Sequence, residues 1–378
     1  MRQYNFIIYL FTALLFSQSV LAQSIANISA VQPTANMNVN QTNSNTGPDQ
    51  IVQQYVTPWM SQNQIPGVAV AIYYQGQDHY YNFGVADTST NQAVTQNTIF
   101  ELASVTKSFT ATLLGICVEQ GKCQLNDPVT HYLPAFSKNT TAAISHVTLQ
   151  ELATHTASFP RMSQDFGVID PAAANADSQL MSQLAQWQPS IPIGTQYQYS
   201  NIGFGLLGEA VANALDTNYS DAVNQYIFQP LNMSSSFVNV PNDQQNRYAQ
   251  GYNEQGNPAP HYDTSAWPGG GGLRSTSADM LQYLKANMGV LNISPQLSAA
   301  MNLTEQGYFN VNPHFTQGLA WQLKDIRNLN VINKNGENQG FNTYVAMVPQ
   351  QKIAIVVLAN KRGVKPNKIA NQILHALA

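Results

Sequence analysis

The stretch NTYVAMVPQQKIAIVVLA, residues 342–359, decides the fold of this chain. Two apolar runs, 342–348 and 353–359, stand on either side of the polar turn Pro-Gln-Gln-Lys. Short runs of this kind, rich in β-branched residues and bounded by turn residues, are typical of strands that pair as a hairpin. The C-terminal part of the chain is therefore predicted to form an antiparallel β-hairpin.

A similar pattern stands near the other end of the chain. The run GVAVAIYY, residues 67–74, precedes a Gln-Gly-Gln turn and a second predicted strand at 79–85. Between the two β regions, the apolar segment 108–116 predicts a buried helix, and residues 202–215 predict another. We therefore expect an α+β fold. Its N- and C-terminal strands would share one antiparallel sheet flanked by helices, with a mostly α-helical lobe inserted between them.

The first residues have the features of an export signal. Arg2 supplies positive charge, residues 6–16 are mostly apolar, and Val-Leu-Ala at 20–22 suits a cleavage site. We expect a signal peptide over 1–22, a disordered leader rich in Asn, Gln and Ser over 23–48, and one folded domain over 49–378. The apolar run is short for a membrane span, so we expect a periplasmic protein with no stable membrane anchor.

Composition narrows the classes of partner. Only 10% of the residues are charged, against about 25% in typical domains. The net charge of −4 and pI near 5.9 offer no basic surface for nucleic acid. Cys117 and Cys123 could form a disulfide in an oxidising compartment or remain two free thiols. Nothing suggests a metal site or an organic cofactor, and we expect a monomer.

Ser104 and Lys107 form the only Ser-x-x-Lys pair in the chain. On a helix, residues i and i+3 lie on one face, where an amine can activate a hydroxyl as a nucleophile. Two later motifs support this chemistry: Tyr-Ser-Asn at 199–201, in a turn-rich loop, and Lys-Asn-Gly at 334–336, just before the hairpin. Taken singly, each motif would also suit a solvated lysine or an ordinary loop aromatic.

Together with their surroundings, these motifs closely resemble the class C β-lactamases. That group belongs to the serine penicillin-recognising enzymes, with the DD-peptidases and β-lactamase-like esterases. The resemblance covers roughly residues 50–378 and includes FELASVTK at 100–107 and LATHTA at 152–157. The Ser-Asp-Asn motif of class A is not matched at Tyr199. The resemblance implies a serine hydrolase that opens a small β-lactam, or a peptidoglycan-like peptide, through an acyl-enzyme.

The resemblance also implies a role for each matching residue. Ser104 would be the nucleophile, flanked by Lys107 and Lys334, whose positive charges would depress each other's pKa. Tyr199 would relay protons, with either Tyr199 or Lys107 as the base. The backbone N–H groups of Ser104 and Glu337 would form the oxyanion hole. The substrate-binding residues would be Asn201, Asn335, Gly336 and Glu337.

The chain departs from the family pattern at three places. Asn335 replaces the threonine of the usual Lys-Thr-Gly motif, whose hydroxyl helps to bind the substrate carboxylate. Glu337 adds a negative charge beside it, which would oppose a carboxylate unless the side chain points outward. Lys365 and Lys368 could restore positive charge or be simple solvated lysines. The stretch Phe-Pro-Arg-Met at 159–162 lacks the glutamine that class C enzymes often carry there.

Other interpretations stay open at this point. A DD-carboxypeptidase, penicillin-binding protein or β-lactamase-like esterase would use the same serine, tyrosine and lysines. A catalytically silent peptidoglycan-binding protein is a further alternative. No G-x-S-x-G motif indicates an α/β-hydrolase, and the four glycines at 269–272 lack the Lys of a phosphate loop. We expect those glycines to form a flexible loop or a close backbone contact. His155 and His314 are expected to be structural or surface residues.

Overall fold

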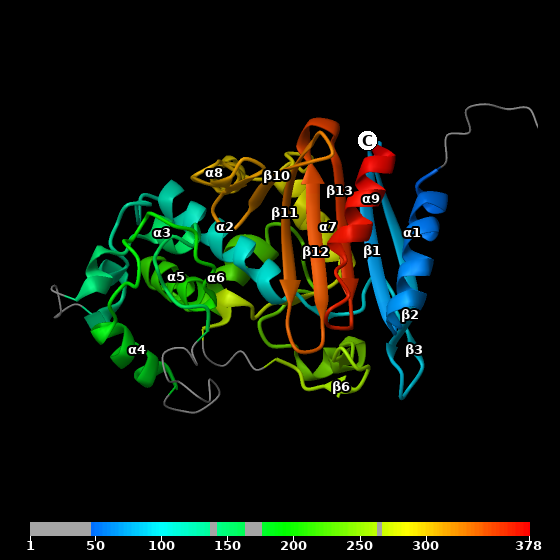
Figure 1. Cartoon of the computed structure of the whole chain (residues 1–378), viewed down its shortest axis with the longest axis horizontal. Helices are drawn as coiled ribbons and strands as arrows, with labels where there is room; N and C mark the ends of the chain where they lie inside the picture. The colour runs from blue at the N-terminus through cyan, green and yellow to red at the C-terminus, as the bar shows by residue number, and fades with distance from the viewer. Residues whose placement is uncertain (1–46, 137–141, 163–175, 263–266) are drawn as a thin grey trace, which may run out of the picture. The chain divides into compact units, whose positions relative to one another are not determined.

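Both ends of the chain contribute to one antiparallel sheet in the computed structural model, which describes residues 47–136, 142–162, 176–262 and 267–378. Within these residues the sheet has nine strands, in the order β3-β2-β1-β13-β12-β11-β10-β9-β8 (Figure 1). The predicted α+β fold is confirmed. The strands are β1 Gly67–Tyr74, β2 Gln77–Asp87, β3 Gln92–Ala93, β8 Phe309–Asn312, β9 Phe315–Gln317, β10 Gln322–Ile326, β11 Leu329–Glu337, β12 Asn342–Val348 and β13 Ile353–Ala359.

The predicted C-terminal hairpin is β12 and β13, joined by the short helix η9, Pro349–Gln351. β13 pairs on its other side with β1, with Val68 opposite Ala359 and Tyr73 opposite Ala354. The N-terminal hairpin of β1 and β2 is thereby joined edge to edge to the C-terminal hairpin, as predicted.

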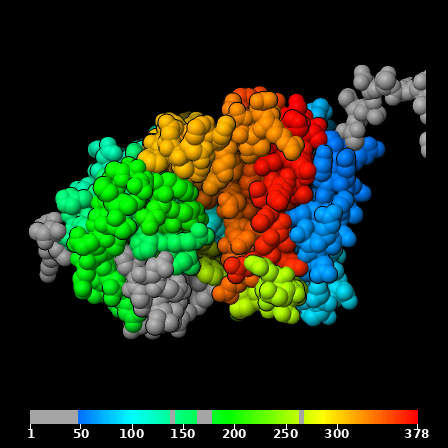
Figure 2. Space-filling model, viewed as in Figure 1, coloured from blue at the N-terminus to red at the C-terminus, as the bar shows by residue number. Residues whose placement is uncertain are grey.

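Helices cover both faces of the central strands, and successive side chains of β1 alternate between the two faces. Val68, Val70 and Ile72 belong to the core under α1, Pro48–Asn63, and α9, Asn367–Leu377. Ala69 and Ala71 belong to the core on the other face, with α7, Ser277–Asn287. Figures 1 and 2 show α9 in red beside α1 in blue over the sheet. This two-sided burial explains why β1 is apolar throughout; each buried Val or Ile contributes about 1.5–3 kcal/mol.

The inserted part is mostly helical, and α2 lies at its centre. Every residue of α2 from Thr106 to Cys117 is buried, as expected of a helix surrounded by protein. In Figure 1, α2 runs between the sheet and the helices α3, α5 and α6. The helices of this part are α2 Thr106–Glu119, α3 Leu149–Ala153, α4 Ala176–Gln186, α5 Asn201–Ala214, α6 Tyr219–Val223 and α8 Pro295–Thr304, with η1 Ala103–Val105 ahead of α2 and η8 Pro268–Gly270 beside α5.

The two cysteines form a disulfide at the end of α2. Gly121 has a left-handed φ of 67°, its N–H bonds to Val118 O at 2.9 Å, and the Lys122 N–H bonds to Cys117 O at 3.0 Å. These are the two bonds of a Schellman motif, which reverses the chain after a helix. The reversal brings the Cα atoms of Cys117 and Cys123 to 5.6 Å, inside the usual range for a disulfide.

The predicted signal peptide, and the leader up to residue 46, lie outside the described residues, so the proposed division of the chain stays a prediction. Among the described helices, none combines the length and apolar character needed to cross a bilayer.

Candidate active site

Ser104 lies in η1, immediately before α2, and Lys107 lies in the first turn of α2. The segment is fixed by its neighbours: the Leu273 N–H donates to Thr106 Oγ1 at 3.0 Å, and Ala103 takes a left-handed φ of 48°. A non-glycine residue in that region is strained. The Ser104 N–H therefore lies at the positive end of a buried helix, where a developing negative charge is favoured.

Two side chains meet at the Ser104 hydroxyl. Tyr199 OH lies 2.7 Å from Ser104 Oγ, and Lys107 Nζ lies 3.3 Å from the same oxygen. Tyr199 reaches it from the loop before α5, and the helical i, i+3 spacing brings Lys107 to it. The structure thus brings together the serine, lysine and tyrosine that the motifs single out.

Lys107 is fully buried and has two further partners. Its Nζ donates to Asn201 Oδ1 at 2.8 Å and to the carbonyl of Gly270. Burial, followed by the positive charges of Lys334 and Arg161, lowers the pKa of Lys107 well below its ordinary value. A neutral amine has two hydrogens and one lone pair. With both hydrogens donated to Asn201 and Gly270, the lone pair is left for the proton of Ser104.

Lys334 completes the cluster from β11. Its side chain is buried, and its Nζ lies 5.1 Å from the centroid of the Tyr199 ring. Burial, with the nearby charge of Lys324, lowers the pKa of Lys334 to about 7. Burial raises the pKa of Tyr199 to about 12, so this tyrosine is a neutral phenol at neutral pH. Lys334 therefore changes its charge near neutral pH.

The four-glycine segment makes the close backbone contact that its composition suggests. A Cβ atom on Gly269 would lie 2.9 Å from Phe204 O, and one on Gly270 would lie 2.8 Å from Asn201 O. These distances are too short for a real side chain, so the segment can lie against α5 only because it has none. That contact carries the Gly270 carbonyl to Lys107.

Gly336 brings β11 against the segment that carries Ser104. The Thr343 hydroxyl donates to Leu102 O at 2.9 Å, and a Cβ on Gly336 would lie only 2.2 Å from the same Leu102 oxygen and 3.1 Å from Ser104 N. From Lys334 onward, β11 pairs with β12 but no longer with β10. An edge of main-chain groups is therefore left beside Ser104.

We expect Gly336→Ala to lower kcat/KM by about 100-fold, because moving β11 away from Leu102 by about 1 Å would misplace the reacting groups. Steady-state hydrolysis of a chromogenic cephalosporin would measure the loss. Gly203→Ala is the matched control, since a Cβ there meets its nearest neighbour at an ordinary 3.5 Å. Equal activity of the two variants would contradict the expectation.

Asn335 and Glu337 alternate with Lys334 and Gly336, so their exposed side chains lie on the other face of β11. The carboxylate of Glu337 lies 3.6 Å from Nε of Arg362. Glu337 therefore points outward and has a partner for its charge.

Asn342 connects β11 to the start of α9. Its Nδ2 donates to Gly336 O and its Oδ1 accepts from Lys365 N, both at 2.8 Å. This bridge holds the exposed Lys365 near the Lys-Asn-Gly motif. Lys368 follows in α9 and is also exposed.

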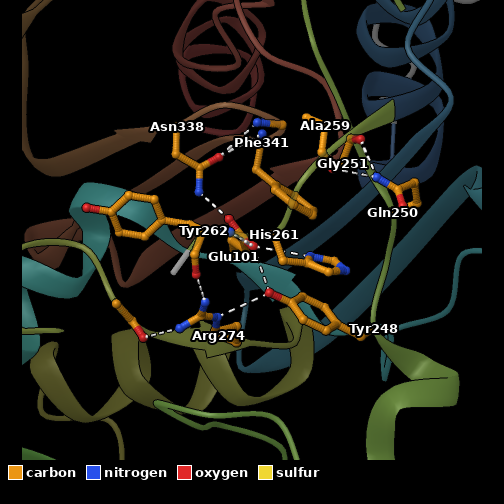
Figure 3. A network of polar contacts seen from close by, with 12 residues as sticks. Glu101, Tyr248, Gln250, Gly251, Ala259, His261, Tyr262, Arg274, Asn338 and Phe341 are labelled. Carbon is orange, nitrogen blue, oxygen red and sulfur yellow. Dashed lines mark hydrogen bonds and ion pairs between the residues drawn. The ribbon is translucent and has the colours of Figure 1, made fainter. Parts of the chain in front are cut away.

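A buried network anchored on Glu101 ties these pieces together (Figure 3). Burial alone would raise the pKa of Glu101, but hydrogen bonds from His261 and Tyr248 keep it below its ordinary value. The second carboxylate oxygen of Glu101 accepts a hydrogen bond from Nδ2 of Asn338, the residue that follows Glu337 in the sequence. Arg274 bonds to Tyr248 OH at 3.1 Å and to Gly272 O at 2.8 Å. One carboxylate thus connects the segment before Ser104, the end of β11 and the glycine segment.

The motifs do not point to two residues that contact Tyr199. The His155 ring packs on the Tyr199 ring with centroids 4.3 Å apart, and its Nδ1 accepts from Ser200 N at 3.2 Å. Burial, then Lys334, Lys107 and Arg161, lowers the pKa of His155. Arg161 is exposed, and its guanidinium carbon lies 5.2 Å from the Tyr199 centroid.

His314 is an exposed residue. Within the part of the chain that the structure describes, no three His, Cys, Asp or Glu side chains are grouped so that they could hold a metal ion.

Comparisons with known proteins place this cluster in a family. The family model for β-lactamases matches residues 49–378. A β-lactamase of Pseudomonas fluorescens is 32% identical over 372 residues, which cover 87% of this chain and 98% of that protein. A class C β-lactamase solved with cefoxitin aligns with a TM-score of 0.80 and 32% identity, covering 87% of this chain and 98% of that one.

A D-alanine carboxypeptidase from Burkholderia cenocepacia aligns almost as well. Its TM-score is 0.78 and its identity 32%, and the alignment covers 87% of this chain and 99% of that one. Matches of this extent include the sheet, the helical part and all the segments that meet at Ser104. The chain belongs to the β-lactamase family, on its class C branch.

Proposed function

We propose that this protein is a serine β-lactamase of class C type, which hydrolyses the β-lactam amide through an acyl-enzyme on Ser104. The observation that carries the proposal is the contact of Ser104 Oγ with Tyr199 OH at 2.7 Å and with Lys107 Nζ at 3.3 Å, in a partly buried site that also holds the buried Lys334. The β-lactamase with cefoxitin bound, similar to this chain over most of its length, supports a β-lactam as the substrate.

Acylation follows from the protonation states of the cluster. Lys107, whose pKa is lowered by burial, accepts the proton of Ser104 as Oγ attacks the lactam carbonyl. The N–H groups of Ser104 and Glu337 stabilise the oxyanion. The C–N bond then breaks, and the neutral phenol of Tyr199 gives its proton to the leaving nitrogen. Ser104 is left as an ester of the opened lactam.

Deacylation uses the same groups with water in place of the lactam nitrogen. A water molecule attacks the ester carbonyl and gives its proton to Tyr199, which acylation left deprotonated. Ser104 Oγ then leaves and recovers the proton that Lys107 had accepted. Asn201 is suited to hold the substrate's side-chain amide, since its Oδ1 already accepts from Lys107. For the substrate carboxylate, the candidates are Lys334 and, beside the end of β11, the exposed Asn335 and Lys365.

We expect substrate binding to depend on pH because of Lys334. Its pKa is lowered to about 7, so it is charged below pH 7 and loses its charge as the pH rises through that value. The KM for a penicillin, whose carboxylate is attracted by this charge, should rise by about tenfold between pH 6 and pH 8. An uncharged penicillin ester is the control, and its KM should stay flat. A penicillin KM that falls over this range would contradict the role of Lys334.

The second candidate is a DD-carboxypeptidase, favoured by the similarity to the D-alanine carboxypeptidase. It would use the same acylation and differ in how fast water frees the serine. A β-lactamase-like esterase or a silent peptidoglycan-binding protein on this scaffold is less well supported, because all four reactive side chains are present and in contact range.

One experiment separates these functions. The purified mature protein is given a chromogenic cephalosporin, a penicillin whose adduct is followed by intact mass, and a peptide ending in D-Ala-D-Ala. Rapid turnover of the cephalosporin with little adduct supports the β-lactamase. A lasting adduct with release of D-alanine supports the carboxypeptidase. Absence of both adduct and turnover would exclude the penicillin-recognising function.

We expect the protein to act as a monomer in the periplasm after removal of residues 1–22. A monomer is the simplest arrangement, since the described site is built from one chain. Mass spectrometry of exported protein would test whether it begins at Gln23.

A further inference from the structure

Arg161 is a cation beside the candidate site with no described anion to pair with. Its guanidinium carbon lies 5.2 Å from the centroid of the Tyr199 ring, and the residue is exposed. Among the ion pairs between described residues, none includes Arg161. An arginine that stacks on an aromatic ring keeps the hydrogen-bonding edge of its fork available for an anion.

The charge of Arg161 affects the pKa values of three residues of the cluster. It helps to lower the pKa of Lys107 and of His155, after burial and the nearby lysines, and it opposes the rise that burial causes in the pKa of Tyr199. The charged groups that shift the pKa of Lys107 are all positive. Of the two charged groups that act on Lys107, Lys334 is buried and Arg161 is exposed to solvent.

The position of Arg161 indicates which part of a substrate it would meet. Its carbonyl accepts from the Asn201 N–H at 2.9 Å, and the neighbouring Met162 sulfur lies 3.0 Å from Asn201 Nδ2. Arg161 thus lies alongside Asn201, the residue assigned to the side-chain amide, whereas Asn335 and Lys365 belong to other segments, at the end of β11 and before α9. We therefore expect Arg161 to meet the acyl side chain of a bound β-lactam.

We propose that Arg161 binds a negatively charged group on the acyl side chain of the substrate, so that the enzyme prefers β-lactams with a second anion next to the side-chain amide. The proposal rests on the proposed function. A guanidinium can hold a carboxylate through two parallel hydrogen bonds, and such charge-assisted bonds are stronger than neutral ones. The side chain is exposed, so solvent and salt weaken the contact without removing it.

The test compares two penicillins that differ by one carboxylate. One has a phenylacetyl side chain, and the other has a phenylmalonyl side chain, with the carboxylate on the carbon next to the amide. The measured quantity is the ratio of kcat/KM for the phenylmalonyl substrate to that for the phenylacetyl one. Any effect of Arg161 through Lys107 changes both values alike and cancels in this ratio.

Arg161→Gln should lower the ratio by about five- to tenfold, and Arg161→Lys should retain part of it. The fall in kcat/KM with added NaCl should be steeper for the phenylmalonyl substrate in the original protein and equal for both in Arg161→Gln. Arg327→Gln is the matched control: it removes the same charge from the exposed turn between β10 and β11, and should leave the ratio unchanged.

Three outcomes decide the matter. A ratio that falls in Arg161→Gln alone supports the contact. A ratio that is unchanged in Arg161→Gln, or that falls equally in Arg327→Gln, overturns the inference while the β-lactamase function stands. Failure of the original protein to react with either penicillin overturns the proposed function, and this inference with it.

Discussion

Ser104→Ala is expected to abolish turnover of β-lactams and to remove the covalent adduct. The loss should be about 10⁵–10⁶-fold, the scale expected when a serine hydrolase loses its nucleophile. Ser104 Oγ is the oxygen at which Tyr199 OH and Lys107 Nζ converge. Intact-mass measurement with a penicillin and steady-state rates with a chromogenic cephalosporin would both report the change.

The substitution should have little effect on the stability of the folded state. Ser104 makes two hydrogen bonds in a strained segment, so the free energy of unfolding should change by no more than about 1 kcal/mol. Ser108→Ala is the matched control, because Ser108 lies one turn further along α2 and its hydroxyl donates to Val105 O, at 2.8 Å. An adduct that persists in Ser104→Ala, or one lost equally in Ser108→Ala, would show that another group reacts.

Lys107→Met should slow acylation by about 10³–10⁴-fold, the contribution of a well-placed general base. Methionine fills a similar volume without an amine, so Ser104 would lose the group that accepts its proton. Asn201 Oδ1 and Gly270 O would lose their donor as well. The rate of adduct formation in a single turnover isolates this step from hydrolysis of the acyl-enzyme.

Two further variants test whether the slower acylation is due to loss of the base. Lys107→Arg restores a cation but not a neutral base, so it should be as slow as Lys107→Met if the base role is correct. Lys285→Met removes a lysine that pairs with Asp78 at 2.8 Å, away from Ser104, and should acylate normally. If Lys107→Met is acylated at a rate within tenfold of the original rate, Lys107 is not the base, and Tyr199 is the residue that accepts the proton.

The fold was predictable because its strands are short, apolar and bounded by turns. Residues 342–348 and 353–359 coincide with β12 and β13, and 67–74 with β1. The clustering of Ser104, Lys107, Tyr199 and Lys334 was predictable because their motifs are local and come in a fixed order. The pairing of Cys117 with Cys123 was not, because it depends on the chain reversal at Gly121, which spacing alone does not establish.

The contacts between segments that are distant in the sequence could not be predicted from it. Gly270 meets Lys107 across 163 residues, and Asn338 meets Glu101 across 237. Such contacts depend on where whole segments pack and on the directions of individual side chains. The same is true of Arg161. The sequence shows only that its stretch, residues 159–162, lacks a glutamine, whereas the structure places Arg161 over the Tyr199 ring.

The pairing of β1 with β13 has a consequence for how the protein is made. The Gly67 N–H bonds to Asn360 Oδ1 across 293 residues, so the middle of the sheet stays incomplete until nearly the whole chain has been synthesised. Contacts between residues so far apart in sequence slow folding, because the loop between them must be ordered first. A ribosome-bound chain lacking β13 and α9 would leave one edge of β1 unpaired and its Val68, Val70 and Ile72 face without α9, which makes chaperone binding during synthesis an advantage for this topology.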